Sequence, residues 1–482
     1  MAVFSAASSY YLSGGTANVG LFPELYYLKH TLLILLALLG ILFFIIRGKY
    51  KLNFVFILVI PYIFYLGINY GIVFVQLISF LIAATLLSYI YNLKIFLDSK
   101  IIFIYYLVVP LFIGYLGLMV DMPAMDRWHT EFINAKKNLD SYIVIIASYF
   151  IAFYLGSNFI KLLPAKRMNF KTVTKFPIKN LNIVGYLFFF VALSFAVSYK
   201  DILFTGYKTY ELSILGALAT LNNVSLIFYF YILFNTGISS KNIFLWNIIF
   251  SSILLIGLGS RMYVLIPLIA LFTYKLFFSK KKWKFNKVIF YGFLILVFIL
   301  IIGAWRIGSN ISVDFLIYLF LAEPTFTWWS TATFLGNNEL SMIGIPANYF
   351  SSFLNFLPSF IFKNKSNLII GLGEYYYYNA PLGADSIFVS IQGNFGWYFG
   401  TLFMFCVGFY YSLIEFASRK NSFLMAYYIG VVSILPFQFF RDNFAIINKQ
   451  IFWNILIVPF VILTVLLFLL KVSKFNTKKE TT

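Results

Sequence analysis

The chain has 482 residues, of which 62% are hydrophobic, 22% aromatic and only 11% charged. Soluble globular domains carry about a quarter charged residues, so this composition excludes that class and predicts an all-α, polytopic integral membrane protein. The net charge of +20 is distributed over alternate loops. We therefore expect it to orient the chain in the membrane and to contact anionic membrane lipids, and we do not expect it to bind nucleic acid.

Thirteen apolar segments recur along the chain, nearly all of them long enough to cross the ~30 Å hydrocarbon core as a helix. They cover residues 28–46, 52–70, 72–93, 101–120, 141–163, 181–199, 212–234, 243–259, 261–278, 288–305, 395–416, 422–440 and 449–470. We divide the chain into ten spans in residues 1–305, a large external loop in residues 306–394, and three spans with a basic tail in residues 395–482. Tight hairpins are predicted at Tyr70–Gly71 and Gly259–Ser260.

Basic residues concentrate in every second loop. The basic loops are Arg47–Lys51, Lys94–Lys100, Lys166–Lys179, Ser279–Lys287, Arg419–Lys420 and the tail after Lys471. Because such loops stay in the cytoplasm, the N-terminus is predicted outside and the C-terminus inside. The 306–394 loop then lies on the outer face of the membrane.

The external loop 306–394 is too long and too aromatic to be a simple linker. Its residues 314–335 have helical apolar density broken at Pro324, and residues 346–362 read as an amphipathic helix closed by Pro358. We expect both helices to lie along the outer leaflet or to dip into it, where the aromatic residues suit the membrane interface.

Arginines on the outer side oppose the orientation rule, so they need another explanation. Arg261 opens the ninth span, Arg306 follows the tenth, and Arg441 lies between the last two, which places all three near one membrane depth. A guanidinium is always charged and its planar fork fits phosphate oxygens, so we expect these arginines to bind a diphosphate. The alternative for each is a contact with lipid phosphate or a local ion pair, such as that of Arg441 with Asp442.

Transfer of a glycosyl or acyl group to a hydroxyl requires a general base. The candidates on the outer side are Glu323 in an apolar segment, Asp385 among several glycines, and His129 in the loop after the fourth span. Each also has a plain structural interpretation: a residue that ends a helix, a packing position, or a loop histidine without a chemical role.

Aromatic rings of the external loop are candidates to stack on sugar faces. We single out Tyr376 and Tyr377 from a run of four tyrosines, and Trp328 from the helical segment before it. A girdle of interfacial aromatic residues explains them equally well.

Sequence signals for cofactors are missing. The chain has one cysteine and two histidines, which makes a zinc centre improbable, and it has no phosphate-binding glycine loop or dinucleotide fingerprint. We expect no cofactor and no metal ion, and a substrate that is delivered through the membrane.

Four features together resemble one family. They are the "GSR" of residues 259–261, the large external loop before the last three spans, the "GNFGWYFG" of residues 393–400, and an arginine between the last two spans. This layout is similar to that of the Wzy-type oligosaccharide repeat-unit polymerases of O-antigen and capsule synthesis. The resemblance implies a metal-free, multi-helix glycosyltransferase fold of the C superfamily in the bacterial plasma (inner) membrane. Arg261 and Arg441 match its late-span arginines, and Arg306 is added from the topology.

The resemblance also implies a reaction on the outer face of the membrane. The growing glycan, held by undecaprenyl diphosphate, moves onto the non-reducing hydroxyl of a newly flipped lipid-linked repeat unit, and the implied partners are a chain-length-regulating co-polymerase and a flippase. Three alternatives stay open: a ligase with another acceptor, a lipid-linked oligosaccharide flippase or other transporter, and a dolichol-type or arabinosyl glycosyltransferase. Spans nearly free of charge weigh against a transporter.

Overall fold

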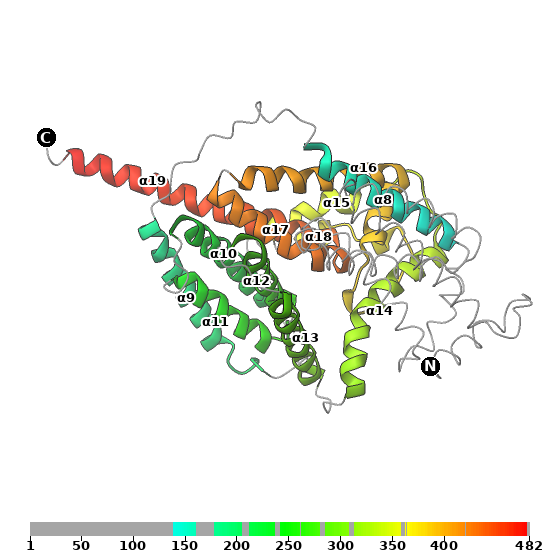
Figure 1. Ribbon diagram of the computed structural model, residues 1–482, viewed down its shortest axis with the longest axis horizontal. Helices are drawn as coiled ribbons and strands as arrows, with labels where there is room; N and C mark the ends of the chain where they lie inside the picture. The colour runs from blue at the N-terminus through cyan, green and yellow to red at the C-terminus, as the bar shows by residue number, and fades with distance from the viewer. Residues whose placement is uncertain are drawn as a thin grey trace, which may run out of the picture. The chain divides into compact units, whose positions relative to one another are not determined.

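The computed structural model describes residues 138–160, 178–204, 212–236, 242–260, 262–279, 285–307, 313–357, 362, 364–419 and 421–479 (Figure 1). The first four expected spans and His129 lie outside these residues. Within the described ranges every regular element is a helix, as expected for an all-α protein.

Each expected span from residue 141 onward coincides with a helix. The α-helices are α8 (Leu139–Phe159), α9 (Ile178–Ser198), α10 (Leu212–Thr236), α11 (Ile243–Gly257), α12 (Met262–Thr273), α13 (Phe285–Ile307), α14 (Val313–Asn337), α15 (Ala347–Ser351), α16 (Ile387–Ser418), α17 (Ser422–Arg441), α18 (Phe444–Asn448) and α19 (Val458–Lys479). There are two π-helical segments: η5 (Tyr274–Phe278) extends α12, and η10 (Lys449–Ile457) precedes α19. Short 3-10 turns are η6 (Ser352–Phe356), η7 (Lys365–Leu368), η8 (Leu372–Glu374) and η9 (Pro381–Gly383).

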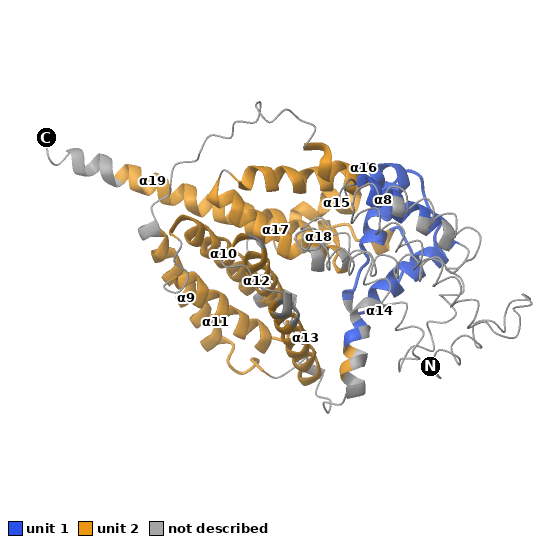
Figure 2. Cartoon of the chain, in the orientation of Figure 1, with its two compact units in different colours: residues 1–152, 320–344, 375–402 blue, residues 153–319, 345–374, 403–482 orange. Residues whose placement is uncertain are grey.

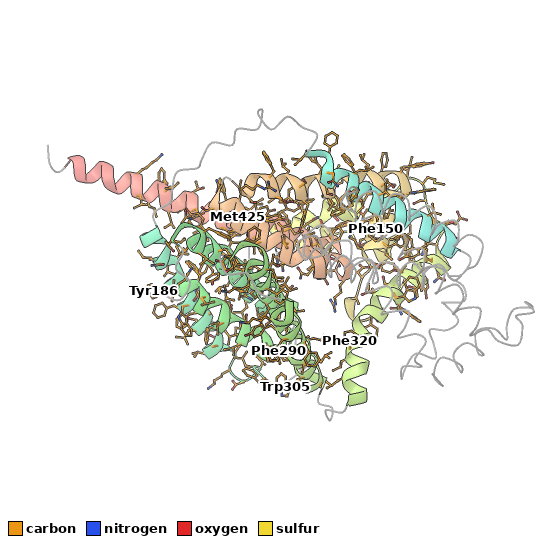
Figure 3. All side chains as sticks on the ribbon, viewed as in Figure 1. Phe150, Tyr186, Phe290, Trp305, Phe320 and Met425 are labelled. Carbon is orange, nitrogen blue, oxygen red and sulfur yellow. The ribbon has the colours of Figure 1, made fainter. Side chains whose placement is uncertain are left out.

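Four helical stretches in the described part are long and apolar enough to cross a membrane. They are Leu181–Ser198, Leu215–Thr236, Ile387–Ser418 and Phe444–Val472. Large apolar side chains such as Tyr186 on α9 and Phe290 on α13 are exposed, which suits contact with lipid (Figure 3). These features agree with an integral membrane protein.

The chain forms two compact units, each assembled from distant parts of the sequence (Figure 2). The first contains residues 1–152, 320–344 and 375–402, and the second contains residues 153–319, 345–374 and 403–482. Segment 306–394 therefore contributes residues to both units.

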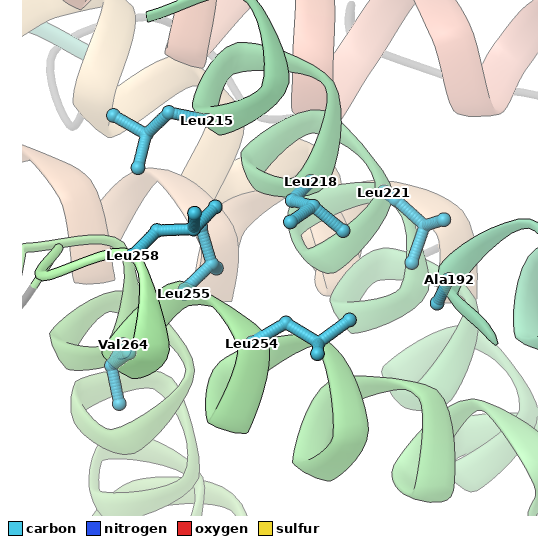
Figure 4. Packing of buried hydrophobic residues seen from close by; sticks show 8 residues of the cluster. All are labelled: Ala192, Leu215, Leu218, Leu221, Leu254, Leu255, Leu258 and Val264. Carbon is cyan, nitrogen blue, oxygen red and sulfur yellow. The ribbon is translucent and has the colours of Figure 1, made fainter. Parts of the chain in front are cut away.

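Helix α10 forms the centre of the second unit. It is apolar on nearly all sides and packs against α11, α12 and α17. A leucine-rich cluster from α9, α10, α11 and α12 fills the space between these helices (Figure 4). Its buried members are Ala192, Leu215, Leu218, Leu221, Leu254, Leu255, Leu258 and Val264.

A chain of neutral amides crosses the same unit between α10 and η10. Thr220 donates to the Oδ1 of Asn454 (3.1 Å), the Nδ2 of Asn454 donates to the Oε1 of Gln450 (2.8 Å), and Asn223 donates to that same oxygen. Because a buried polar group without a partner is costly, this chain specifies how the two helices face each other without burying a charge.

The turn between α11 and α12 forms at the glycine where the hairpin was predicted. Gly259 has φ +79°, a conformation that favours glycine, and it ends α11 with two backbone hydrogen bonds. Ser260 N donates to Leu255 O and Gly259 N donates to Ile256 O, both at 2.8 Å. Helix α11 therefore ends at the predicted position, and α12 begins at Met262.

The prediction of a break at Pro324 was wrong, because α14 is one helix from Val313 to Asn337. A proline inside a helix removes one hydrogen bond, which often ends the helix, but neighbouring groups in membrane proteins compensate for the loss. The segment after it is helical up to the predicted end: α15 and η6 finish at Phe356, two residues before Pro358.

Helix α16 contains a break that the sequence did not predict. Gly396 has φ +68° and ψ −165°, so the helical backbone is interrupted there. Residues 341 and 342 pair with the chain just after the break: Trp397 N donates to Ser341 O and Tyr398 N donates to Met342 O, both at 3.0 Å. A Cβ on Gly396 would lie 2.7 Å from Ile343 N, so no other residue fits without movement.

We expect Gly396→Ala to destabilise the protein by about 3 kcal/mol, because the new methyl group combines backbone strain with steric overlap. Thermal unfolding of the detergent-solubilised protein, followed by size-exclusion chromatography, measures this loss. Gly292→Ala on α13 is the matched control, since a Cβ there meets nothing within 4 Å. Equal melting temperatures for both variants would contradict a fixed break at Gly396.

Candidate functional site

The candidate residues fall into three groups in the structure. Arg261 and His129 lie outside the described residues, and the side chains of Arg306 on α13 and Glu323 on α14 are likewise not among those described. The remaining candidates are described in full: Asp385, Trp328, Tyr376 and Tyr377 in the first unit and Arg441 in the second.

Asp385 is a buried carboxylate, 5% exposed, two residues before α16 begins. Tyr378 Oη donates to Asp385 Oδ2 (3.2 Å). Asp385 Oδ1 accepts from Ser330 Oγ (3.5 Å) and from the backbone N–H of Ser386 (3.1 Å). The start of a helix also favours negative charge. Asp385 thus connects α14 and the tyrosine segment through hydrogen bonds from hydroxyl groups, and it also accepts from the backbone N–H just before α16.

Tyr378 remains a hydrogen-bond donor to Asp385 over the whole neutral range. Burial raises the pKa of the Tyr378 hydroxyl, and the charge of Asp385 and the hydrogen bond to it raise that pKa further. A sugar hydroxyl that approaches Asp385 would therefore compete with hydroxyl donors that keep their protons.

The four tyrosines of residues 375–378 alternate between two environments. Tyr376 and Tyr378 turn inward, with ring centroids 5.3 and 6.3 Å from that of Phe334 on α14. Tyr375 and Tyr377 turn outward, and Tyr377 is 73% exposed. Alternation with a period of two is typical of extended backbone.

A side chain of α14 and one from the residue just after it hold this extended segment in place. Asn338 Nδ2 donates to Tyr377 O (2.7 Å) and its Oδ1 accepts from Tyr377 N (3.1 Å), while Thr333 Oγ1 accepts from Asn379 N (2.9 Å). Of the tyrosines selected from the sequence, Tyr377 is therefore the one whose ring is available to a ligand, and Tyr376 is half-buried.

Trp328 lies in the core of the first unit. It is 1% exposed, and its ring makes an edge contact with Tyr142 on α8 at 5.8 Å between centroids. A sugar-stacking role for Trp328 would require this contact to open.

Arg441 forms an ion pair with the next residue. Its Nη1 lies 3.1 Å from Asp442 Oδ1, and the two side chains are 16% and 1% exposed. The local pairing that was the alternative for Arg441 is therefore present. A carboxylate this close orients the guanidinium but also offsets part of its charge, so an anion must compete with Asp442.

Helices α12 and α17 pack against each other in opposite directions. The ring of Phe278, just after α12, lies 6.2 Å from that of Tyr428, in the first half of α17. The start of α12 is therefore at the same end of the pair as Arg441, the last residue of α17. Arg261 directly precedes Met262, the first residue of α12, in the sequence.

Two lysines of the second unit were not considered in the sequence analysis, which examined only arginines on the outer side. Lys365 Nζ donates to Leu357 O (2.7 Å), and burial lowers the pKa of Lys365. Its charge acts on Lys449, a half-buried residue at the start of η10. Lys365 lies in the external loop that the sequence predicts and Lys449 at the outer end of the last predicted span, and these positions were the available signal.

Comparison with known proteins identifies a family. The model of the family O-antigen polysaccharide polymerase Wzy matches residues 50–328, a region that contains Arg261, Arg306, Glu323 and Trp328. No curated protein and no solved structure matches the chain. Because the family match covers more than half of the chain, the protein belongs to the Wzy family of O-antigen polysaccharide polymerases, membrane glycosyltransferases that act on lipid-linked oligosaccharide repeat units.

Proposed function

We propose that the protein polymerises undecaprenyl-diphosphate-linked repeat units on the outer face of the bacterial plasma membrane. The growing glycan is transferred from its lipid diphosphate onto the non-reducing end of a new lipid-linked repeat unit. Membership of the Wzy family is the observation that carries this proposal. A flippase that delivers the repeat units and a co-polymerase that regulates chain length are the proposed partners.

The transfer exchanges one bond at the anomeric carbon for another. The bond from this carbon to the diphosphate oxygen breaks, a bond to the acceptor hydroxyl oxygen forms, and the hydroxyl proton passes to a base. The lipid diphosphate leaves with the negative charge. Catalysis therefore requires positive charge at the diphosphate and a base at the acceptor hydroxyl.

Arginines supply the positive charge in this proposal. Arg441 and Arg261 are assigned to the diphosphate because α12 begins at the end of the helix pair where Arg441 lies, and Arg306 is assigned from the topology. Guanidinium groups remain protonated and offer paired donors to phosphate oxygens, so the proposed mechanism needs no metal ion or other cofactor.

Asp385 is the preferred general base among the three candidates. Its carboxylate already accepts hydrogen bonds from two hydroxyl groups, those of Tyr378 and Ser330. A sugar hydroxyl is the same kind of donor, so it can replace one of them and transfer its proton as the new bond forms. Glu323 and His129 remain the other candidates, and the exposed ring of Tyr377 is the preferred sugar contact.

Purified protein incubated with a lipid-diphosphate-linked repeat unit should produce a ladder of glycans that differ by one unit. Gel electrophoresis of the labelled product measures the ladder, and EDTA should leave it unchanged. Unaltered substrate that only crosses a vesicle membrane would indicate a transporter instead. Single transfer to a different acceptor, without a ladder, would indicate a ligase.

Arg441→Ala should lower the polymerisation rate about a hundredfold while the protein still inserts into the membrane. The reason is that the variant loses a positive charge where negative charge develops on the leaving diphosphate. The ladder assay measures the rate, and Arg441→Lys should restore only part of it. Arg419→Ala is the matched control, since Arg419 is 69% exposed in its ion pair with Glu415. A normal ladder from Arg441→Ala would contradict the diphosphate role.

Asp385→Asn should lower the rate about a hundredfold, because the amide keeps the shape of the carboxylate but cannot accept the proton. Tyr378→Phe should keep the rate within about tenfold, since it removes one donor and leaves the base. If both variants lose activity together with thermal stability, Asp385 has only a structural role.

A further inference from the structure

A segment of the second unit, residues 345–374, covers the start of the last membrane-crossing helix. Asn355 Nδ2 donates to Ala445 O (2.9 Å), and Asn448 Nδ2 donates to Ser352 Oγ (2.8 Å). The ring of Phe356 stacks on that of Trp453 at 5.8 Å. Turn η6 is thus fastened to α18 and η10 by hydrogen bonds and aromatic contact.

This arrangement brings two positive charges near each other. Lys449 is the first residue of η10, and Lys365 begins η7 in the covering segment. Lys365 Nζ donates to Leu357 O (2.7 Å), the residue after Phe356, and the ring of Phe356 stacks on that of Trp453, one helical turn after Lys449. Both lysine side chains are half-buried. The ion pairs found among the described residues are Arg419–Glu415 and Arg441–Asp442, so neither lysine is paired with an acid there.

Two ammonium groups that repel each other in a partly desolvated place destabilise the fold unless an anion lies between them. An ammonium group is a compact charge with three donors and binds phosphate well. The geometry points to a binding site for the phosphate of a membrane lipid formed by Lys365 and Lys449, distinct in its residues from the proposed arginine site.

Two observations favour a lipid over a soluble anion. Lys449 lies near the start of the apolar stretch Phe444–Val472, close to where lipid headgroups meet a membrane helix. Two apolar side chains of the covering segment, Leu357 and Phe362, are exposed and offer contact to a hydrocarbon chain. A lipid carries a phosphate group and a hydrocarbon chain in one molecule, so it can contact the lysines and the apolar side chains together.

The phosphate has two potential sources, an ordinary anionic phospholipid or a lipid diphosphate. The second source rests on the proposed function, because a polymerase that joins two lipid-linked glycans holds two diphosphates at once. The arginines would bind one diphosphate and the lysine pair the other.

Binding of undecaprenyl diphosphate and of phosphatidylglycerol to the full chain tests this site, with the protein in phosphatidylcholine nanodiscs and native mass spectrometry as the readout. The double variant Lys365→Ala/Lys449→Ala should lose about tenfold in affinity, as expected for charge-assisted hydrogen bonds, whereas Lys365→Arg/Lys449→Arg should retain binding. Lys200→Ala, an exposed lysine just after α9 and outside the basic loops, is the matched control.

The two lipids separate the two sources. A loss confined to undecaprenyl diphosphate identifies a substrate subsite, and an equal loss for both lipids identifies a general headgroup site. Unchanged binding of both lipids to the double alanine variant would overturn the inference. Binding is measured without turnover, so the two proposals can fail separately. If the unmodified protein forms no glycan ladder but the double alanine variant binds less lipid, the proposed function is contradicted and the lysine site is supported.

Discussion

A backbone N–H that is removed from water needs a partner from the protein, and the first unit meets this requirement where α16 breaks. The carbonyls of Ser341 and Met342 accept from Trp397 and Tyr398 just beyond Gly396. The side chain of Gln392 also donates to Ser341 O (2.8 Å), and Tyr149 on α8 donates to Gly396 O (3.0 Å). Helix α8, the loop after α14 and both halves of α16 therefore form one hydrogen-bonded frame, and Asp385 lies two residues before α16 begins.

The two units manage polar groups in different ways. In the second unit neutral amides on α10 and η10 donate to one another inside the helix packing, and Arg441 is the last residue of α17. Both units bury a carboxylate, but Asp442 of the second unit is paired with Arg441, whereas Asp385 of the first unit accepts hydrogen bonds from the hydroxyl groups of Tyr378 and Ser330. This contrast is the physical reason to assign proton transfer to Asp385 and diphosphate binding to the basic residues.

Features that depend on nearby residues could be predicted from the sequence. The lengths of the apolar runs identified the helices from residue 141 onward, and a glycine at the end of an apolar run identified the turn at Gly259. The break at Gly396 depends on residues 341–344, which are distant in the chain, so local patterns contained no sign of it. The partners of Asp385 were hidden for the same reason, because Ser330 belongs to a different helix. Pro324 misled because a proline often ends a helix, whereas α14 continues through it.

The alternation of the tyrosine run also affects how the protein can change over evolution. Tyr376 packs against Phe334 and Tyr378 donates a hydrogen bond to Asp385, so substitutions at these two positions alter folding. The side chains of Tyr375 and Tyr377 face outward and are exposed. Repeat units that differ in their sugars could thus be accommodated by mutations at alternate positions of one short segment, with selectivity diverging while the scaffold beneath is inherited unchanged.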